Sequence, residues 1–121
     1  MNIEKILNEE SIDYLNQEYD EKIKIYKLNN KANLVQITGD YSTFAIDRDL
    51  NYYLNSQNMV YAFILVNKND SKLFYLEFRD KNNWLNASFE RSNKDRLYFG
   101  KVVLNNQVNL FKLRERIKKL V

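Results

Sequence analysis

The side chains best suited to chemistry in this sequence are cations near its C-terminal end. Lys112, Arg116 and Lys119 are spaced four and three residues apart. Arg114 and Lys118 are spaced four apart in the same stretch. Residues at these spacings lie on one side of a helix, so each set forms a row of positive charge. The first row is the one that we expect to contact a partner carrying phosphate or carboxylate groups.

Charge is segregated along the chain, although the formal net charge is only +3. Residues 1–21 hold seven acidic side chains and one basic one, whereas residues 91–121 hold nine basic and two acidic ones. One interpretation is that an acidic first helix lies near a basic last helix and that most of the charges are solvated. The other is a basic face that meets nucleic acid, a nucleotide or an acidic protein. The asymmetry alone favours neither.

A second group of candidate binding cations is Arg91, Lys94 and Arg96. Aromatic side chains that could stack on nucleic-acid bases surround them, namely Trp84, Phe89, Tyr98 and Phe99. Aromatic residues in alternating strands are more often part of a core, so base stacking stays open. Tyrosine is also enriched at protein interfaces, for which the candidates are Tyr41, Tyr52 and Tyr53.

The composition excludes several kinds of catalysis. The chain has no cysteine and no histidine, so it cannot form disulfides or thiolate metal sites and lacks the imidazole of Ser-His catalysis. Its two glycines, Gly39 and Gly100, are too few for a phosphate-cradling glycine loop. Asp47 and Asp49 offer two carboxylates without a base partner, and Asp47 is explained as a helix cap. No leader and no apolar run of membrane length is present, so we expect a soluble cytoplasmic protein.

The element that must position these side chains is a central strand at Val60–Val66. This run, VYAFILV, is wholly apolar, as expected for a strand that is covered on both faces. The turn-rich segment NKNDS follows it, and Lys72–Phe78 then mixes polar and apolar residues. The pattern predicts a hairpin whose first strand lies inside the sheet.

The N-terminal segment predicts a helix with two alternatives for its end. Asn2 can cap this helix, and the 3.6-residue period then places four side chains on one side: Ile3, Ile6, Leu7 and Tyr14. Ser11 is also a good cap, so a break there would start a second short helix that carries Ile12 and Leu15. Both alternatives remain open in the sequence.

A second hairpin is predicted between this helix and the central strand. Lys22–Leu28 alternates with a period of two, which places Ile23 and Ile25 on one face of a strand. Two asparagines at 29–30 favour a turn, because asparagine tolerates positive φ at little cost. Ala32–Thr38 then returns as the second strand.

Three elements are predicted in the middle of the chain and beyond the central hairpin. A helix over residues 48–56 begins after Asp47 as its cap. Residues 79–95 are mostly polar and predict a short helix under a loop. Residues 96–104 predict another strand, with Gly100 at a bulge.

The last helix begins near Leu110 with Asn109 as its cap, and its predicted core side holds Leu110, Leu113, Ile117 and Leu120. The predicted order is thus helix, two strands, helix, two strands, helical loop, strand and helix. We therefore predict a single domain over residues 1–121 with an α+β or α/β fold. Its mixed, mainly antiparallel sheet has about five strands, with helices at the start, middle and end of the chain.

Three motifs carry a resemblance to a known family. They are LVQITG at Leu34–Gly39, in place of a VQLKG strand, LNYYL at Leu50–Leu54, and MVYAFILVNKNDSKLFYLEF at residues 59–78. Through them, the stretch Tyr19–Phe78 resembles the core of the PD-(D/E)xK restriction-endonuclease-like families. The resemblance is greatest to a small bacterial domain of unknown function associated with defence genes.

The resemblance implies a nuclease scaffold, in which acidic residues of adjacent strands hold Mg²⁺ and a lysine stabilises or activates the attacking water. Carried onto this sequence, Gln36 stands at the metal-side position and Thr38 stands where the family has its lysine. Threonine cannot supply the cation, so we expect a catalytically silent scaffold without a cofactor. The alternative is a Mg²⁺-dependent endonuclease with a rearranged site, for which the candidates are Asp20, Glu21 and Gln36.

The sequence therefore predicts a non-catalytic binding protein on a nuclease-like scaffold. The predicted partner is nucleic acid, a nucleotide or an acidic protein, with no membrane involved, and a homo-oligomer stays open. The predicted binding residues are Lys112, Arg116, Lys119, Arg91, Lys94 and Arg96. The resemblance also suggests a mobile-element inhibitor of a bacterial defence system.

Overall fold

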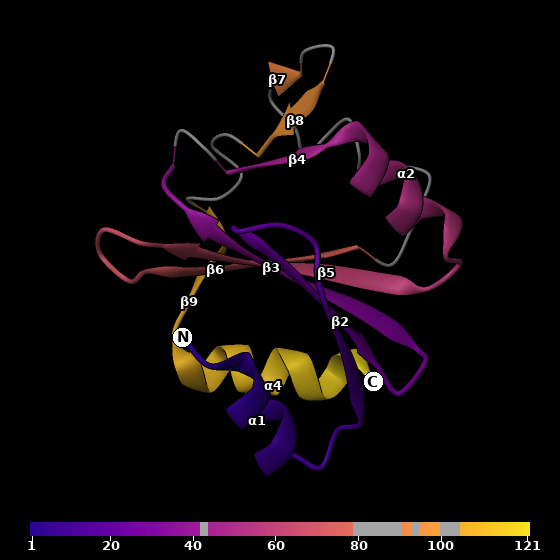
Figure 1. The fold of residues 1–121 in the computed structure, drawn as a ribbon. Helices are drawn as coiled ribbons and strands as arrows, with labels where there is room; N and C mark the ends of the chain where they lie inside the picture. The colour runs from indigo at the N-terminus through magenta and orange to yellow at the C-terminus, as the bar shows by residue number, and fades with distance from the viewer. Residues whose placement is uncertain (42–43, 79–90, 93–94, 100–104) are drawn as a thin grey trace.

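The structure is a computed structural model that describes residues 1–41, 44–78, 91–92, 95–99 and 105–121. These residues form one α+β domain with three layers (Figure 1). A twisted six-stranded sheet forms the middle layer. Helices α1 and α4 cover one face of this sheet, and helix α2 and a second, three-stranded sheet cover the other face.

The elements of the main sheet and the helices have the following bounds. The helices are α1 (Ile3–Glu9), α2 (Arg48–Ser56) and α4 (Leu110–Leu120). The main sheet has the order β1-β2-β3-β5-β6-β9. Its strands are β1 (Tyr14–Glu18), β2 (Ile23–Leu28), β3 (Ala32–Gly39), β5 (Val60–Asn67), β6 (Leu73–Phe78) and β9 (Gln107–Val108). The second sheet has the order β4-β8-β7, and its strands are β4 (Ala45–Asp47), β7 (Arg91–Ser92) and β8 (Arg96–Tyr98).

The predicted central strand is confirmed as β5, which lies between β3 and β6. It pairs with β6 as an antiparallel hairpin and with β3 in parallel, because helix α2 carries the chain back across the sheet. Every residue from Tyr61 to Asn67 is buried, as expected for a strand with covered faces. The remaining pairs of both sheets are antiparallel, so the predicted mixed, mainly antiparallel sheet is also confirmed.

The alternation of side chains along β2 divides the interior into two cores. Ile23 and Ile25 pack into the core on the α2 side of the main sheet. Tyr26 and Leu28 pack into the core on the α1 and α4 side. A shift of one residue in the strand register would exchange the two sets, so the pattern fixes how β2 sits in the sheet.

Asparagine and aspartate residues define the β2–β3 turn and the starts of the three described helices. Asn29 and Asn30 have φ of 48° and 55° and close the β2–β3 hairpin as predicted. Asn2, Asp47 and Asn109 each accept a backbone N–H in the first turn of α1, α2 and α4. All three predicted caps are confirmed.

The end of the first helix differs from both predicted alternatives. Helix α1 stops at Glu9, and Ser11 adopts a φ of 55° instead of capping a second helix. The N–H of Ser11 donates to the carbonyl of Asn8 and that of Ile12 donates to Leu7, which is the hydrogen-bond pattern of a Schellman motif. The chain then turns into strand β1, which gains a full antiparallel ladder with β2.

Other corrections concern the second half of the chain. The main sheet alone has six strands, so the expected number of about five was too low. Residues 91–92, predicted within a helical loop, pair instead with β8. The predicted strand at 96–104 is described as β8 over Arg96–Tyr98, while Gly100 and most of the segment 79–95 lie outside the described residues. Leu110, predicted on the core side of α4, is 60% exposed because it begins the helix beyond the edge of the core.

None of the helices in the described part of the chain has the length and apolar character needed to cross a bilayer.

Candidate functional site

Packing against the main sheet fixes the orientation of helix α4. Leu113, Ile117 and Leu120 are buried in the core that α4 shares with α1, as predicted. Because these three side chains define the inner side of the helix, the two rows of cations must lie on its flanks. The two flanks have different surroundings.

The flank that faces α1 carries the row of Arg114 and Lys118, and acidic side chains neutralise it. The guanidinium of Arg114 donates to the carboxylates of Glu9, at 2.7 Å, and Glu10, at 3.0 Å. Lys118 lies 3.9 Å from the second oxygen of Glu10. The hydrogen bonds to Glu10 and Glu9 raise the pKa of Arg114. This row therefore joins the last helix to the first.

The opposite flank carries Lys112 and Arg116, and it forms one wall of a polar pocket of about 390 Å³ between α4, β6 and β9. Among the described residues, neither of these two cations has an ion-pair partner. The rest of the polar pocket is lined by Tyr75, Glu77, Asn105, Asn106, Gln107 and Val108.

The polar pocket combines positive charge with hydrogen-bonding groups that suit an anion. The side-chain amides of Asn105, Asn106 and Gln107 each carry two N–H donors. The carboxylate of Glu77 accepts a hydrogen bond of 3.0 Å from the hydroxyl of Tyr75 on the same strand. Two cations against one carboxylate leave the pocket with net positive charge, so it is suited to phosphate or carboxylate groups.

Two of the three residues predicted for the main binding row thus meet at the polar pocket, and Lys119 does not line it. Lys119 is exposed one turn beyond Arg116 on the same flank of α4. The sequence did not point to the amides or to Tyr75 and Glu77. The pairing of β6 with β9 brings these strand residues beside the amides, which lie some 30 positions later in the chain, in the wall of the polar pocket. A strand as short as β9 has almost no recognisable sequence pattern.

The second predicted set of cations lies elsewhere. Arg91 and Arg96 are on β7 and β8, which lie on the opposite side of the main sheet from α4 (Figure 1). Lys94 is outside the described residues. Phe99 beside them is fully buried in the core, so it is not available to stack on a base. The six predicted binding residues therefore do not form one surface.

The alternative catalytic residues are only partly brought together. Asp20 and Glu21 line a pocket of about 350 Å³ together with Lys22 and Arg96. Gln36 is buried on the other face of the sheet, because Ile37 lines this pocket and successive residues of a strand point to opposite faces. One carboxylate oxygen of Asp20 also accepts the backbone N–H groups of Lys22 and Ile23.

The described residues contain no group of three acidic side chains that could hold a metal ion. Asp47, the other acidic candidate, is occupied by its structural role as the cap of α2, since its carboxylate accepts the N–H of Leu50 at 2.6 Å. The second oxygen accepts the hydroxyl of Tyr19 at 2.7 Å. Burial and this hydrogen bond raise the pKa of Tyr19 to about 12.

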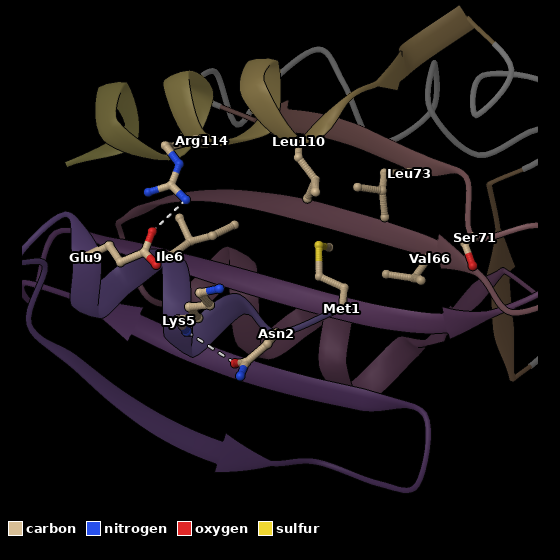
Figure 2. Close-up of a pocket in the computed structure, with 10 residues that line it drawn as sticks. All are labelled: Met1, Asn2, Lys5, Ile6, Glu9, Val66, Ser71, Leu73, Leu110 and Arg114. Carbon is tan, nitrogen blue, oxygen red and sulfur yellow. Dashed lines mark hydrogen bonds and ion pairs between the residues drawn. The ribbon is translucent and has the colours of Figure 1, made fainter.

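A cavity of about 490 Å³ forms an apolar groove on the other flank of α4 (Figure 2). Its walls come from α1, from the ends of β5 and β6 and from the first turn of α4. Its lining residues are Met1, Asn2, Lys5, Ile6, Glu9, Val66, Ser71, Leu73, Leu110 and Arg114. No pattern in the sequence predicted this groove, because Leu110 was assigned to the core.

Comparisons of the chain find no matching family model, no matching curated protein and no matching solved structure. The candidate function accordingly depends on the polar pocket, the apolar groove and the residues around them.

Proposed function

We propose that this protein is a non-catalytic binding protein that engages an anionic partner through Lys112 and Arg116 of helix α4. The classes of partner that fit are nucleic acid, a nucleotide and an acidic protein. The observation that carries the proposal is the contrast between the two flanks of α4. Arg114 and Lys118 are neutralised by carboxylates, whereas Lys112 and Arg116 line an open polar pocket without an ion-pair partner among the described residues.

Electrostatics support a binding role for this row over a structural one. A cation that stabilises a fold is normally placed beside a carboxylate, as Arg114 is. Lys112 and Arg116 lie one helical turn apart, and they can contact neighbouring anionic groups of one ligand. Each phosphate that they neutralise would release counterions, so affinity for a polyanion falls steeply as salt rises.

Two double variants with equal loss of charge test the proposal. Lys112→Gln with Arg116→Gln removes the row at the polar pocket, and Arg114→Gln with Lys118→Gln removes the neutralised row. Binding is measured by fluorescence anisotropy with labelled oligo-dT, labelled ATP and labelled poly-glutamate over a range of salt concentrations, and stability is measured by thermal unfolding.

The pocket variant should bind at least one of these probes about tenfold more weakly with a shallower salt dependence, while its melting temperature stays nearly unchanged. The matched variant should lose melting temperature and keep its affinity. Equal affinities for the two variants, or a pocket variant that melts lower and binds as wild type does, would contradict the proposal.

A second candidate, the Mg²⁺-dependent nuclease, has one observation in its favour. Asp20 and Glu21 share a pocket with two cations, which is the kind of group that metal-assisted phosphodiester cleavage uses. Two observations count against the nuclease. Gln36 faces away from the pocket of Asp20 and Glu21, and two carboxylates are few for a magnesium site. We expect no cleavage of plasmid, linear duplex or single-stranded DNA in Mg²⁺ or Mn²⁺ at neutral pH. Cleavage that disappears in Asp20→Asn or Glu21→Gln would replace the binding proposal with this one.

A further inference from the structure

Exposed apolar side chains gather at one place on the described surface. Six large apolar or aromatic residues are exposed on the described surface, and three of them lie at or next to the apolar groove: Met1 at 44%, Leu110 at 60% and Phe111 at 72%. Met1 and Leu110 line the apolar groove, and Phe111 follows Leu110 in the first turn of α4. Single exposed apolar residues are common, but a cluster beside a cavity is typical of an interaction surface.

The interior of the apolar groove is suited to aliphatic side chains. Ile6 of α1 and Val66 and Leu73 of the β5–β6 hairpin lie along it, and Leu110 closes it from α4 (Figure 2). Ile6, Val66 and Leu73 are at most 8% exposed, and all three are packed in the core on the α1 and α4 side of the main sheet. Because these three side chains are already packed in the core, a partner would not have to order them on binding.

Positive charge lies on both sides of the exposed cluster. Lys5 lines the apolar groove and has no ion-pair partner among the described residues. Lys112, which lines the polar pocket, is the neighbour of Phe111 in the first turn of α4. The charged side chains that line the apolar groove have a net charge of one positive charge, and so do the charged side chains that line the polar pocket. A segment lying across the start of α4 would meet an apolar groove, then Phe111, then a pair of cations.

We propose that this surface docks an acidic amphipathic segment of another protein. Its apolar side chains would fill the apolar groove and cover Phe111, and its carboxylates would reach Lys112 and Arg116. The inference rests on the proposed function and selects the acidic protein from the three partner classes. A nucleic acid would use the cations and could stack a base on Phe111, but it would leave the aliphatic groove empty, whereas an amphipathic segment uses the groove, Phe111 and the cations together.

A selection from a random 12-residue peptide library displayed on phage tests this inference with the whole chain as bait. Enriched peptides should combine acidic residues with Leu, Ile, Phe or Trp. Each enriched peptide is then synthesised, and its affinity is measured for four proteins: wild type, Phe111→Ser, the pocket variant with Lys112→Gln and Arg116→Gln, and Tyr52→Ser. Tyr52 is the matched control because it is 76% exposed on α2, on the opposite side of the main sheet.

The dissociation constant should rise at least tenfold in Phe111→Ser and in the pocket variant, and it should stay within twofold of wild type in Tyr52→Ser. Labelled oligo-dT should bind wild type and Phe111→Ser equally. The inference is wrong if no peptide is enriched, if enriched peptides lack the acidic and apolar combination, or if Phe111→Ser leaves their affinity unchanged. Oligo-dT binding that weakens in both Phe111→Ser and the pocket variant would assign the surface to nucleic acid. That result would overturn the inference while leaving the proposed function intact.

Discussion

Asn33 offers a sharp test of the packing in β3. Its side chain is fully buried, and neither the amide nitrogen nor the amide oxygen has a hydrogen-bond partner among the residues that the structure describes. Its neighbours across the strands are Lys27 and Tyr61. Val35, two positions along on the same face, belongs to the apolar core on the α2 side. The amide is therefore buried beside that core, and no described hydrogen bond offsets its loss of hydration.

The expected effect of Asn33→Leu follows from these two unpaired groups. Each unsatisfied buried group costs about 1–3 kcal/mol, whereas the larger methyl groups of leucine add overpacking strain of about 1–3 kcal/mol. Leucine keeps the branched shape of asparagine, so we expect a net gain of about 1–3 kcal/mol in the free energy of unfolding. With a urea slope of about 2 kcal/mol per molar, the unfolding midpoint should rise by roughly 0.5–1.5 M.

Urea unfolding followed by circular dichroism measures this midpoint, and Asn33→Ala is the companion variant. Alanine removes the polar groups without overpacking, so its loss of packing is offset by the removal of the two unpaired groups and its stability should stay close to wild type. If the free energy of unfolding of both variants is about 2 kcal/mol below that of wild type and the urea slope is unchanged, Asn33 makes hydrogen bonds in solution. That result would show that the amide groups of Asn33 are not unpaired in the folded protein.

Two further predictions concern the central sheet and the Tyr19 contact. Ile64 is fully buried in β5, so we expect Ile64→Asp to abolish cooperative unfolding. An unpaired buried carboxylate costs several kcal/mol, against a total stability on the order of 5–15 kcal/mol. A cooperatively folded variant would show that β5 is peripheral. Burial, and then the hydrogen bond to Asp47, raise the pKa of Tyr19 to about 12, whereas a tyrosine in the unfolded chain has a pKa of about 10. The folded protein holds this proton more tightly, so the stabilisation is fully present below pH 10 and is lost as pH rises towards 12. The stability advantage of wild type over Tyr19→Phe should therefore shrink from pH 9 to pH 12, and a constant difference would disprove the linkage.

The elements that the sequence predicted correctly are those specified by local chemistry. The alternation in β2 and the asparagines at 29–30 specify a hairpin within a few residues of one another. Asp47 and Asn109 cap helices whose apolar periodicity follows at once. The wholly apolar run of β5 predicts a strand that is covered on both faces, and a layered fold provides that cover for its central strands.

Strand β1 was missed because its conformation is determined by a partner and not by its own residues. The segment YLNQE at Tyr14–Glu18 is mostly exposed and lacks strict alternation. Its extended conformation comes from the antiparallel ladder with β2. Ser11 was misjudged for a related reason, since serine is a common helix start but here occupies the left-handed position that ends a helix.

The candidate site could be predicted only as a helix with two charged rows. Periodicity placed Lys112 and Arg116 on one flank of α4 and Arg114 on the other, as the structure has them. Periodicity contains no information about which neighbouring element each flank meets. The polar pocket and the apolar groove arise from β9 and α1, whose positions beside α4 are tertiary.

The charge segregation in the sequence had two opposing interpretations, and the two flanks of α4 bear on them separately. On the α1 flank, Glu9 and Glu10 neutralise Arg114, which is the interpretation in which the ends of the chain attract each other. These carboxylates lie at the end of a seven-residue helix, and no described ion pair extends from them to the opposite flank. There strand β6 offers Glu77, which accepts a hydrogen bond from Tyr75, and β9 with the two residues before it offers three neutral amides. The charges on that flank do not hold the first helix to the last, so attraction between the ends of the chain does not explain them, and they are the cations that the proposed anionic partner would contact.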